Sequence, residues 1–194
     1  MTIFAGIVCL DRSAELRPEA VQALARAMSR CPVDRPVRFS GPGYVLMKVD
    51  IGALPGAGHY GGANGAVTLI AGDPILDDTE PAKRSREDDC HRIHEAIIRD
   101  DEALLAATDG SFALASFDPA SARLTLAADK LGARPLYYTR QGGWIVFASA
   151  LRILEALPFL HLTGDLRGIA ELAAFGYSLG DRTPYREVKL IGPA

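Results

Sequence analysis

The first ten residues, MTIFAGIVCL, contain an uninterrupted apolar run from Ile3 to Leu10. No basic residue precedes the run, Asp11 and Arg12 end it, and no small-residue cleavage site follows, so it lacks the form of a signal peptide. It is also much shorter than the roughly 20 apolar residues that span a bilayer. A continuous run containing Ile, Phe and Val is typical of a strand covered on both faces. The sequence therefore predicts a buried strand at this point.

Composition narrows the class of protein. The 194 residues are 48% apolar and 23% charged, which is typical of a soluble globular protein. A net charge of -3 gives no basic excess for binding nucleic acid. Three cysteines without metal-binding spacing indicate neither a disulfide framework nor a zinc site. We therefore expect a cytoplasmic protein that binds neither nucleic acid nor membrane.

The order of predicted elements favours an α+β fold. Hairpin signals outnumber strand-helix-strand units, which indicates mainly antiparallel sheets with helices outside them. Residues 52–65 and 77–87 are expected to be loops, and the chain after Gly176 is expected to be irregular. The expected strands are residues 3–10, 44–49, 66–72, 111–117, 123–129, 136–139 and 144–149. One helix is expected to start at Arg17, and others are expected over residues 88–99, 102–107, 150–157 and 166–175. Ser149 is the expected N-cap of the helix over 150–157, and Gly176 is expected to end the last helix.

Residues 109–138, DGSFALASFDPASARLTLAADKLGARPLYY, carry the strongest signal. They resemble the glutamine amidotransferase domain of asparagine synthetases, which has a class II, N-terminal-nucleophile (Ntn) fold. The resemblance implies a four-layer αββα sandwich of mainly antiparallel sheets. It also implies that residues 1–194 are a single amidotransferase-like domain, the N-terminal part of a longer synthetase.

Within this segment four residues are expected to build a rigid corner. Gly132 can adopt a positive φ in the turn, and Pro135 fixes the exit into the next strand. Asp129 and Arg134 flank the turn and could pair with each other. These features support the fold and not an activity.

The resemblance also implies that the glutamine site is degenerate. Active relatives begin with Cys-Gly-Ile after removal of Met, and the Cys thiol attacks the glutamine amide with its own α-amine as base. Aligning Gly6 with that Gly places Ala5 at the nucleophile position. The family's Asn-Gly-Glu corresponds to Ala71-Gly72-Asp73, so the oxyanion-holding amide is lost. Asp89 is a weak match for the acidic residue that holds the substrate amine.

Other candidate residues give weaker evidence of a catalytic or binding site. After removal of Met1, Thr2 would have a hydroxyl and a free α-amine, but it lies three residues before Ala5, and the end of a strand is the simpler interpretation. His91 and His94 lie three residues apart on one helix face and are interpreted as surface residues. Cys9 is interpreted as a small buried apolar residue. The basic cluster at residues 83–86 is interpreted as a solvated loop or helix start.

Three functions follow as alternatives. In the first, the chain is a degenerate scaffold of an ATP-dependent, amide-forming synthetase domain, as the resemblance to beta-lactam synthetase and lasso-peptide cyclases implies. The chain has no SGGxDS loop, so ATP and Mg are expected only for that missing domain, and no cofactor or metal is expected here. The second is a standalone amidohydrolase that uses Thr2. The third is a standalone ligand-binding or partner-binding module. The sequence leaves open a homodimer.

Overall fold

The computed structural model describes residues 2–11, 15–29, 31, 34–62, 65–76 and 85–192. The chain divides into two compact units. The six-stranded unit comprises Ile3–Val49 and Pro135–Gly192, and the four-stranded unit comprises Asp50–Arg134 together with Thr2. Each unit contains one β-sheet and its own helices.

The sheet of the six-stranded unit has the order β10-β8-β9-β1-β3-β2, and every neighbouring pair is antiparallel. Its central strand, β1, is buried along its whole length, which confirms the buried strand predicted for the apolar run. The strands are β1 (Ile3–Cys9), β2 (Val37–Gly41), β3 (Tyr44–Val49), β8 (Tyr137–Gln141), β9 (Trp144–Ala148) and β10 (Val188–Leu190).

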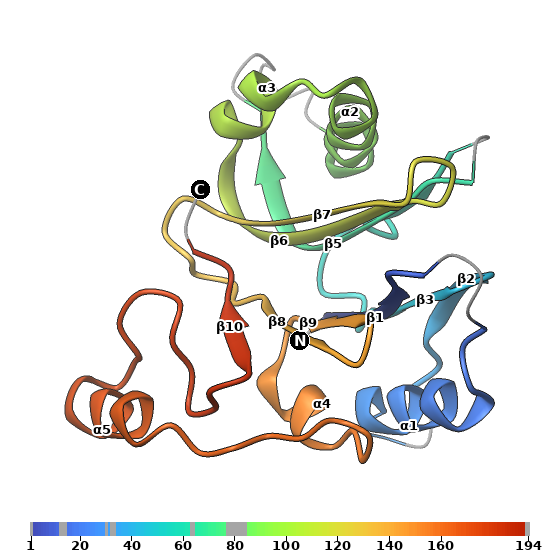
Figure 1. The fold of residues 1–194 in the computed structure, drawn as a ribbon. Coiled ribbons are helices and arrows are strands. Elements are labelled where there is room, and N and C mark those ends of the chain that lie inside the picture. Colours follow the sequence, from blue (N-terminus) through green and yellow to red (C-terminus); the bar gives the residue numbers. More distant parts are fainter. Residues whose placement is uncertain are drawn as a thin grey trace. The chain divides into compact units, whose positions relative to one another are not determined.

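Helices α1 (Pro18–Met28) and α4 (Leu151–Glu155) cover one face of this sheet (Figure 1). Leu24 and Met28 of α1 pack with Ile153 of α4 against alternate residues of β1 and β3. Helix α5 (Leu166–Phe175) lies further along the chain and ends at Gly176, whose φ of 80° is the left-handed cap expected there.

The four-stranded unit has the sheet order β4-β5-β6-β7, again with only antiparallel pairs. Helix α2 packs on this sheet, and α3 contacts α2 (Figure 1). Ile93 and Ile97 of α2 meet Ile70 of β5 and Phe112 of β6 in a separate core. The elements are β4 (His59–Gly61), β5 (Val67–Ile75), α2 (Arg86–Arg99), α3 (Glu102–Ala107), β6 (Asp109–Asp118) and β7 (Arg123–Ala128).

The fold is therefore α+β with two antiparallel sheets, as predicted. Two short strands, β4 and β10, lie in segments that were expected to be a loop or irregular, and a third, β2, lies in a segment for which no element was predicted. Each of the three is at the edge of its sheet. Ser149 is not the N-cap of α4, because Ala150 holds that position and makes no side-chain cap. The buried Ser149 hydroxyl instead accepts the N–H of Phe4 at 2.9 Å. Of the loop expected at 77–87, residues 77–84 lie outside the described residues, and α2 begins at Arg86.

None of the helices in the described part of the chain is both long and apolar enough to cross a membrane.

Candidate functional site

The position assigned to the nucleophile lies inside a continuous strand. Ala5 is opposite Met47 of β3 on one side and Ala148 of β9 on the other, and its exposed fraction is 0%. The adjacent Gly6 lies under the Phe147 ring, where an added Cβ would be 2.4 Å from the ring carbon Cζ. This part of β1 therefore offers a methyl group and a backbone that is paired on both edges.

Thr2 lies just before this strand and belongs to the four-stranded unit. Its hydroxyl donates to Oδ1 of Asp50 at 2.9 Å, and Oδ1 also accepts the N–H of Gly52 at 3.0 Å. Thr2 is 7% exposed, so little of this hydroxyl faces solvent.

The Ala71-Gly72-Asp73 segment lies on β5, where it pairs with β6. Ala71 is buried, and Asp73 is partly exposed opposite Ser111. Gly72 has a φ of 101°, and a Cβ there would lie 2.1 Å from the carbonyl oxygen of Ser111 and 2.5 Å from Nε of Arg134. The backbone can pass this point only as glycine.

The corner expected around Gly132 is organised by one carboxylate. Asp129, almost fully buried, accepts backbone N–H groups from Phe112, Leu131, Ala133 and Arg134 at 2.9 to 3.2 Å. Gly132 has a φ of 61°.

The side chain of Arg134 has a different partner from the one considered for it. Its Nε donates to the carbonyl oxygen of Ser111 at 3.2 Å, while its backbone N–H donates to Asp129. Pro135 follows at the start of the next segment of the six-stranded unit, before β8.

Arg86 is a buried cation that the sequence interpretation assigned to a solvated cluster. It is 6% exposed, and its Nε donates to the carbonyl oxygen of Gly72 at 2.9 Å. Its Nη1 donates to the carbonyl oxygens of Pro55 and Gly56 at 3.0 and 2.9 Å. Arg86 is the first residue of α2, which agrees with the predicted helix start, but it is buried, so the prediction that it is solvated is wrong. Lys83 and Arg84 lie outside the described residues. A cation at the positive end of a helix is unfavourable, and this placement in the sequence could have indicated that Arg86 is held by other hydrogen bonds.

His94 is also buried, so its interpretation as a surface residue is wrong. Its Nδ1 lies 2.7 Å from the Thr68 hydroxyl, which lies 2.8 Å from the Ser116 hydroxyl. Tyr60 packs against the rings of both His91 and His94. Desolvation lowers the pKa of His94, Glu95 opposes that shift, and His91 adds to it. The neutral imidazole is thus the form that this interior favours.

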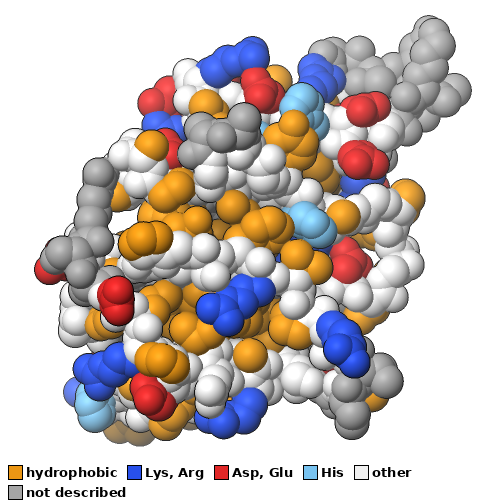
Figure 2. Space-filling model, turned by 90° about the vertical axis from the view of Figure 1, so that its right-hand side faces the viewer, with side chains coloured by type: hydrophobic (Ala, Val, Ile, Leu, Met, Phe, Trp, Pro, Cys, Tyr) orange, Lys and Arg blue, Asp and Glu red, His pale blue; other side chains and the backbone are white. Residues whose placement is uncertain are grey.

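Asp89 and Cys9 are the remaining predicted positions. Asp89 is buried in the first turn of α2, and Cys9 is buried at the end of β1. Across the described ranges, no group of three or more His, Cys, Asp or Glu side chains could hold a metal ion. On the face drawn in Figure 2, the described basic and acidic side chains are interspersed.

The structure therefore brings part of the predicted set together. Gly72, Asp129 and Arg134 meet around Ser111 and Phe112 in the four-stranded unit. Ala5 and Gly6 belong to the six-stranded unit.

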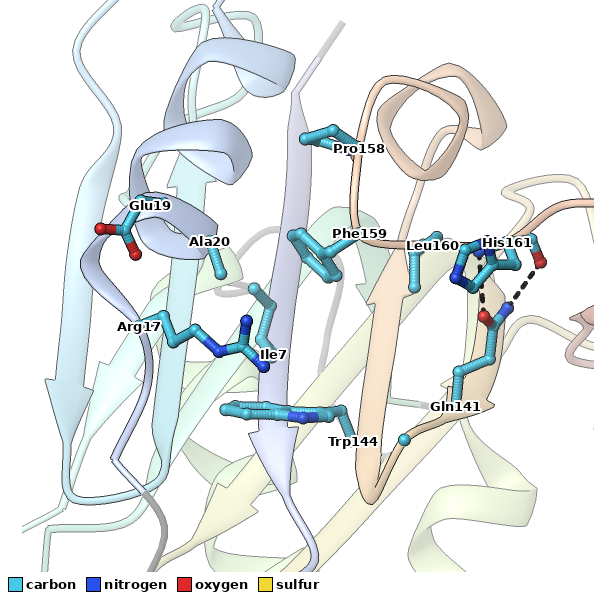
Figure 3. Close-up of a pocket in the computed structure, with 11 residues that line it drawn as sticks. Ile7, Arg17, Glu19, Ala20, Gln141, Trp144, Pro158, Phe159, Leu160 and His161 are labelled. Atoms are coloured by element: carbon cyan, nitrogen blue, oxygen red, sulfur yellow. Dashed lines mark hydrogen bonds between the residues drawn. The ribbon is translucent and has the colours of Figure 1, made fainter.

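A pocket of about 580 Å³ in the six-stranded unit was not anticipated from the sequence (Figure 3). Ile7 of β1, Trp144 of β9, Phe159 and Arg17 are among its lining residues. These residues come from four separate segments, and no local sequence pattern connects them.

Comparison with known proteins identifies the family. The family model for the glutamine amidotransferase domain matches residues 76–194, which is more than half of the chain. The chain belongs to this family. The matched range begins after β5, so it includes Asp89 and the Asp129 corner but not Ala5 or Ala71-Gly72-Asp73.

Two individual proteins are similar to this amidotransferase-like chain. Over 90 residues it is 33% identical to glutamine-hydrolyzing asparagine synthetase 3 of Bacillus subtilis (strain 168). The matched stretch covers 44% of this chain and 14% of that relative. The chain thus spans about a seventh of the length of this curated relative. The glutamine phosphoribosylpyrophosphate (PRPP) amidotransferase of B. subtilis, solved with ADP and GMP, has a similar fold. Its TM-score is 0.50 at 12% identity, with 81% of this chain and 43% of that chain covered.

Proposed function

We propose that this chain is a catalytically degenerate glutamine amidotransferase-like domain. In this proposal it serves as a scaffold for an ATP-dependent, asparagine synthetase-like domain that forms amides. The observation that carries the proposal is that Ala5 occupies the position of the nucleophile. An Ntn glutaminase needs a side-chain nucleophile and a free α-amine on the same residue. Ala5 has no nucleophilic atom, and its backbone lies within a strand paired on both sides.

The segment on β5 supports the same conclusion. An oxyanion hole needs hydrogen-bond donors aimed at the developing charge. Ala71 offers only a methyl group where the family has an Asn, and that methyl group is buried. The structural corner around Asp129 is meanwhile fully formed. A retained framework with an altered site is what a scaffold role requires.

The outer face of α5 supports a partner domain. Leu166, Ile169 and Leu172 recur along this helix and are exposed, with Leu166 at 78%. Phe175 and Tyr177 continue the apolar surface past the end of the helix and pack against each other. Apolar side chains clustered in this way mark protein interaction sites. In this proposal the partner is the synthetase domain, which would hold the ATP and Mg, in a cytoplasmic protein.

The first experiment combines a glutaminase assay with the intact mass of the natural protein from its own host. We expect no glutamate release from glutamine and a mass well above 20.7 kDa. Glutamate release by the purified chain would refute the degenerate site. A natural mass equal to that of this chain would require the synthetase domain to be a separate subunit.

The partner surface is tested by L166D/L172D. Losing two buried leucines from an interface should weaken association at least about tenfold, because each contributes about 1.5 to 3 kcal/mol when buried. Amide formation by the natural protein, or by the chain reconstituted with its synthetase domain, measures this loss. The control is L131D, which places the same charge at a leucine that is 89% exposed in the other unit. Equal activity of the two variants would remove α5 as the docking surface.

The alternative, an amidohydrolase that uses Thr2, is supported by the hydrogen bond that the Thr2 hydroxyl donates to the Asp50 carboxylate. We expect no hydrolysis of small amides by the mature protein. Activity that survives in T2S and disappears in T2A would establish this alternative instead.

A further inference from the structure

The pocket in the six-stranded unit has the size and lining of a small-molecule site. Its volume of about 580 Å³ falls within the usual range for ligand pockets, roughly 300 to 1,000 Å³. All of its lining residues belong to one unit, so the pocket is complete within that unit. Ile7 forms part of its wall with a fully buried side chain.

Two aromatic side chains give the pocket an apolar interior. Trp144 extends from the start of β9 along one side, and Phe159 faces it from the segment after α4 (Figure 3). A planar ring can stack on such aromatic faces and gains more than its buried area alone provides.

The wall that carries Phe159 is fixed to the β8–β9 hairpin. Gln141 donates through Nε2 to the carbonyl oxygen of His161 at 3.0 Å and accepts the N–H of His161 at 3.0 Å. This pair of hydrogen bonds joins residues 20 positions apart (Figure 3). The segment that carries Phe159 is therefore anchored before any ligand arrives, which reduces the entropy lost on binding.

Two charged side chains, Arg17 and Glu19, are among the lining residues of the pocket. Arg17 points from the start of α1 toward Trp144, whereas the carboxylate of Glu19 points away from it (Figure 3). Arg17 is the N-cap residue of α1, and its own side chain makes no capping hydrogen bond to the helix. The start of α1, which is the positive end of its dipole, therefore borders the pocket. A guanidinium binds a carboxylate through two parallel hydrogen bonds.

From this combination we infer that the pocket binds a small aromatic carboxylic acid. Its ring lies between Trp144 and Phe159, and its carboxylate pairs with Arg17. This site is distinct from the residues that the proposed degenerate glutamine site involves, and it does not depend on that proposal.

The chain contains a single Trp, so Trp144 fluorescence reports directly on this pocket. Hydrocinnamate is the probe, hydrocinnamamide is its uncharged equivalent, and propionate lacks the ring. We expect saturable binding of hydrocinnamate, with the amide at least about tenfold weaker, because the amide has no negative charge to pair with the guanidinium of Arg17. Propionate should bind more weakly than hydrocinnamate because it cannot stack.

The variants separate the pocket from general charge effects. R17Q should bring the acid and the amide to the same affinity, whereas R26Q, an exposed arginine on the last turn of α1, should leave the preference unchanged. The inference is wrong if wild-type protein binds acid and amide equally or if R26Q acts like R17Q. It is also wrong if neither fluorescence nor ligand-observed NMR detects hydrocinnamate binding up to about 5 mM, the weak end of ligand affinities.

Discussion

At the scale of single residues, Asp129 holds the corner between β7 and β8. Its carboxylate accepts four backbone N–H groups, from Phe112, Leu131, Ala133 and Arg134. We expect D129A to lower the free energy of unfolding by about 3 kcal/mol, because it leaves the buried Phe112 N–H unsatisfied, at about 1 to 3 kcal/mol, and removes three part-buried hydrogen bonds of about 0.5 to 1.5 kcal/mol each. Urea denaturation measures this loss.

The matched control is D118A. Asp118 also accepts hydrogen bonds within a turn, from Ala120 N–H and the Ser121 hydroxyl, but these lie at the surface. Its removal should cost less than about 1 kcal/mol. A similar loss in both variants would mean that burial of Asp129 contributes nothing special.

His94 makes stability depend on pH. Burial lowers its pKa from the ordinary value of 6.5, so between that value and the lowered one the unfolded chain binds a proton that the folded chain does not. The contribution of neutral His94 is therefore present above about pH 6.5 and is lost as the pH falls through the lowered pKa.

Urea denaturation at a series of pH values measures this dependence. H94Q should lose less stability on acidification than wild type, because Gln does not titrate. H91Q, at the half-exposed neighbouring position, should keep most of the wild-type slope. If H94Q and wild type have the same slope, His94 is not the group responsible.

At the scale of elements, Gly72 is required for the pairing of β5 with β6. G72A would place a Cβ 2.1 Å from the carbonyl oxygen of Ser111, in a residue with a φ of 101°. We expect a loss of about 3 kcal/mol or more in the free energy of unfolding, which combines overpacking with backbone strain.

G143A isolates the backbone part of this cost. Gly143 also has a positive φ, 83°, but beyond its two chain neighbours no atom of the described residues lies within 4 Å of its added Cβ. Its substitution should cost about 1 to 2 kcal/mol. Equal losses in thermal or chemical denaturation of the two variants would show that the close approach at Ser111 relaxes freely.

The strands differ in how well the sequence predicts them. Strands such as β1, β3 and β6 have long apolar runs and were predictable, because burial itself selects their residues. The edge strands β2, β4 and β10 have few buried residues, and only pairing with a neighbour makes them strands.

The candidate site was less predictable than the fold. The burial of Arg86 and His94 depends on which segments pack over α2, which no local pattern encodes. The pocket at Trp144 likewise joins residues from β1, α1, β9 and the segment after α4.

At the scale of the whole molecule, the three cysteines report on different parts of the chain. Cys9 is buried in the six-stranded unit, Cys90 is buried in the four-stranded unit, and Cys31 is exposed. In native protein we expect a thiol reagent to modify Cys31 quickly and the other two only through opening of their own unit. Peptide mass spectrometry after timed labelling measures each rate. Modification of Cys9 or Cys90 as fast as Cys31 would mean that the corresponding core is open.

The position of β1 also has a consequence for synthesis on the ribosome. β1 pairs with β3 soon after it is made, but its other edge must wait for Trp144–Ala148. At usual elongation rates that delay is on the order of 5 to 20 seconds. Throughout it, an apolar strand presents an open edge on which a neighbouring nascent chain can pair. We therefore expect the soluble yield to fall when translation is slowed upstream of the Trp144 codon, and extra chaperone to restore it.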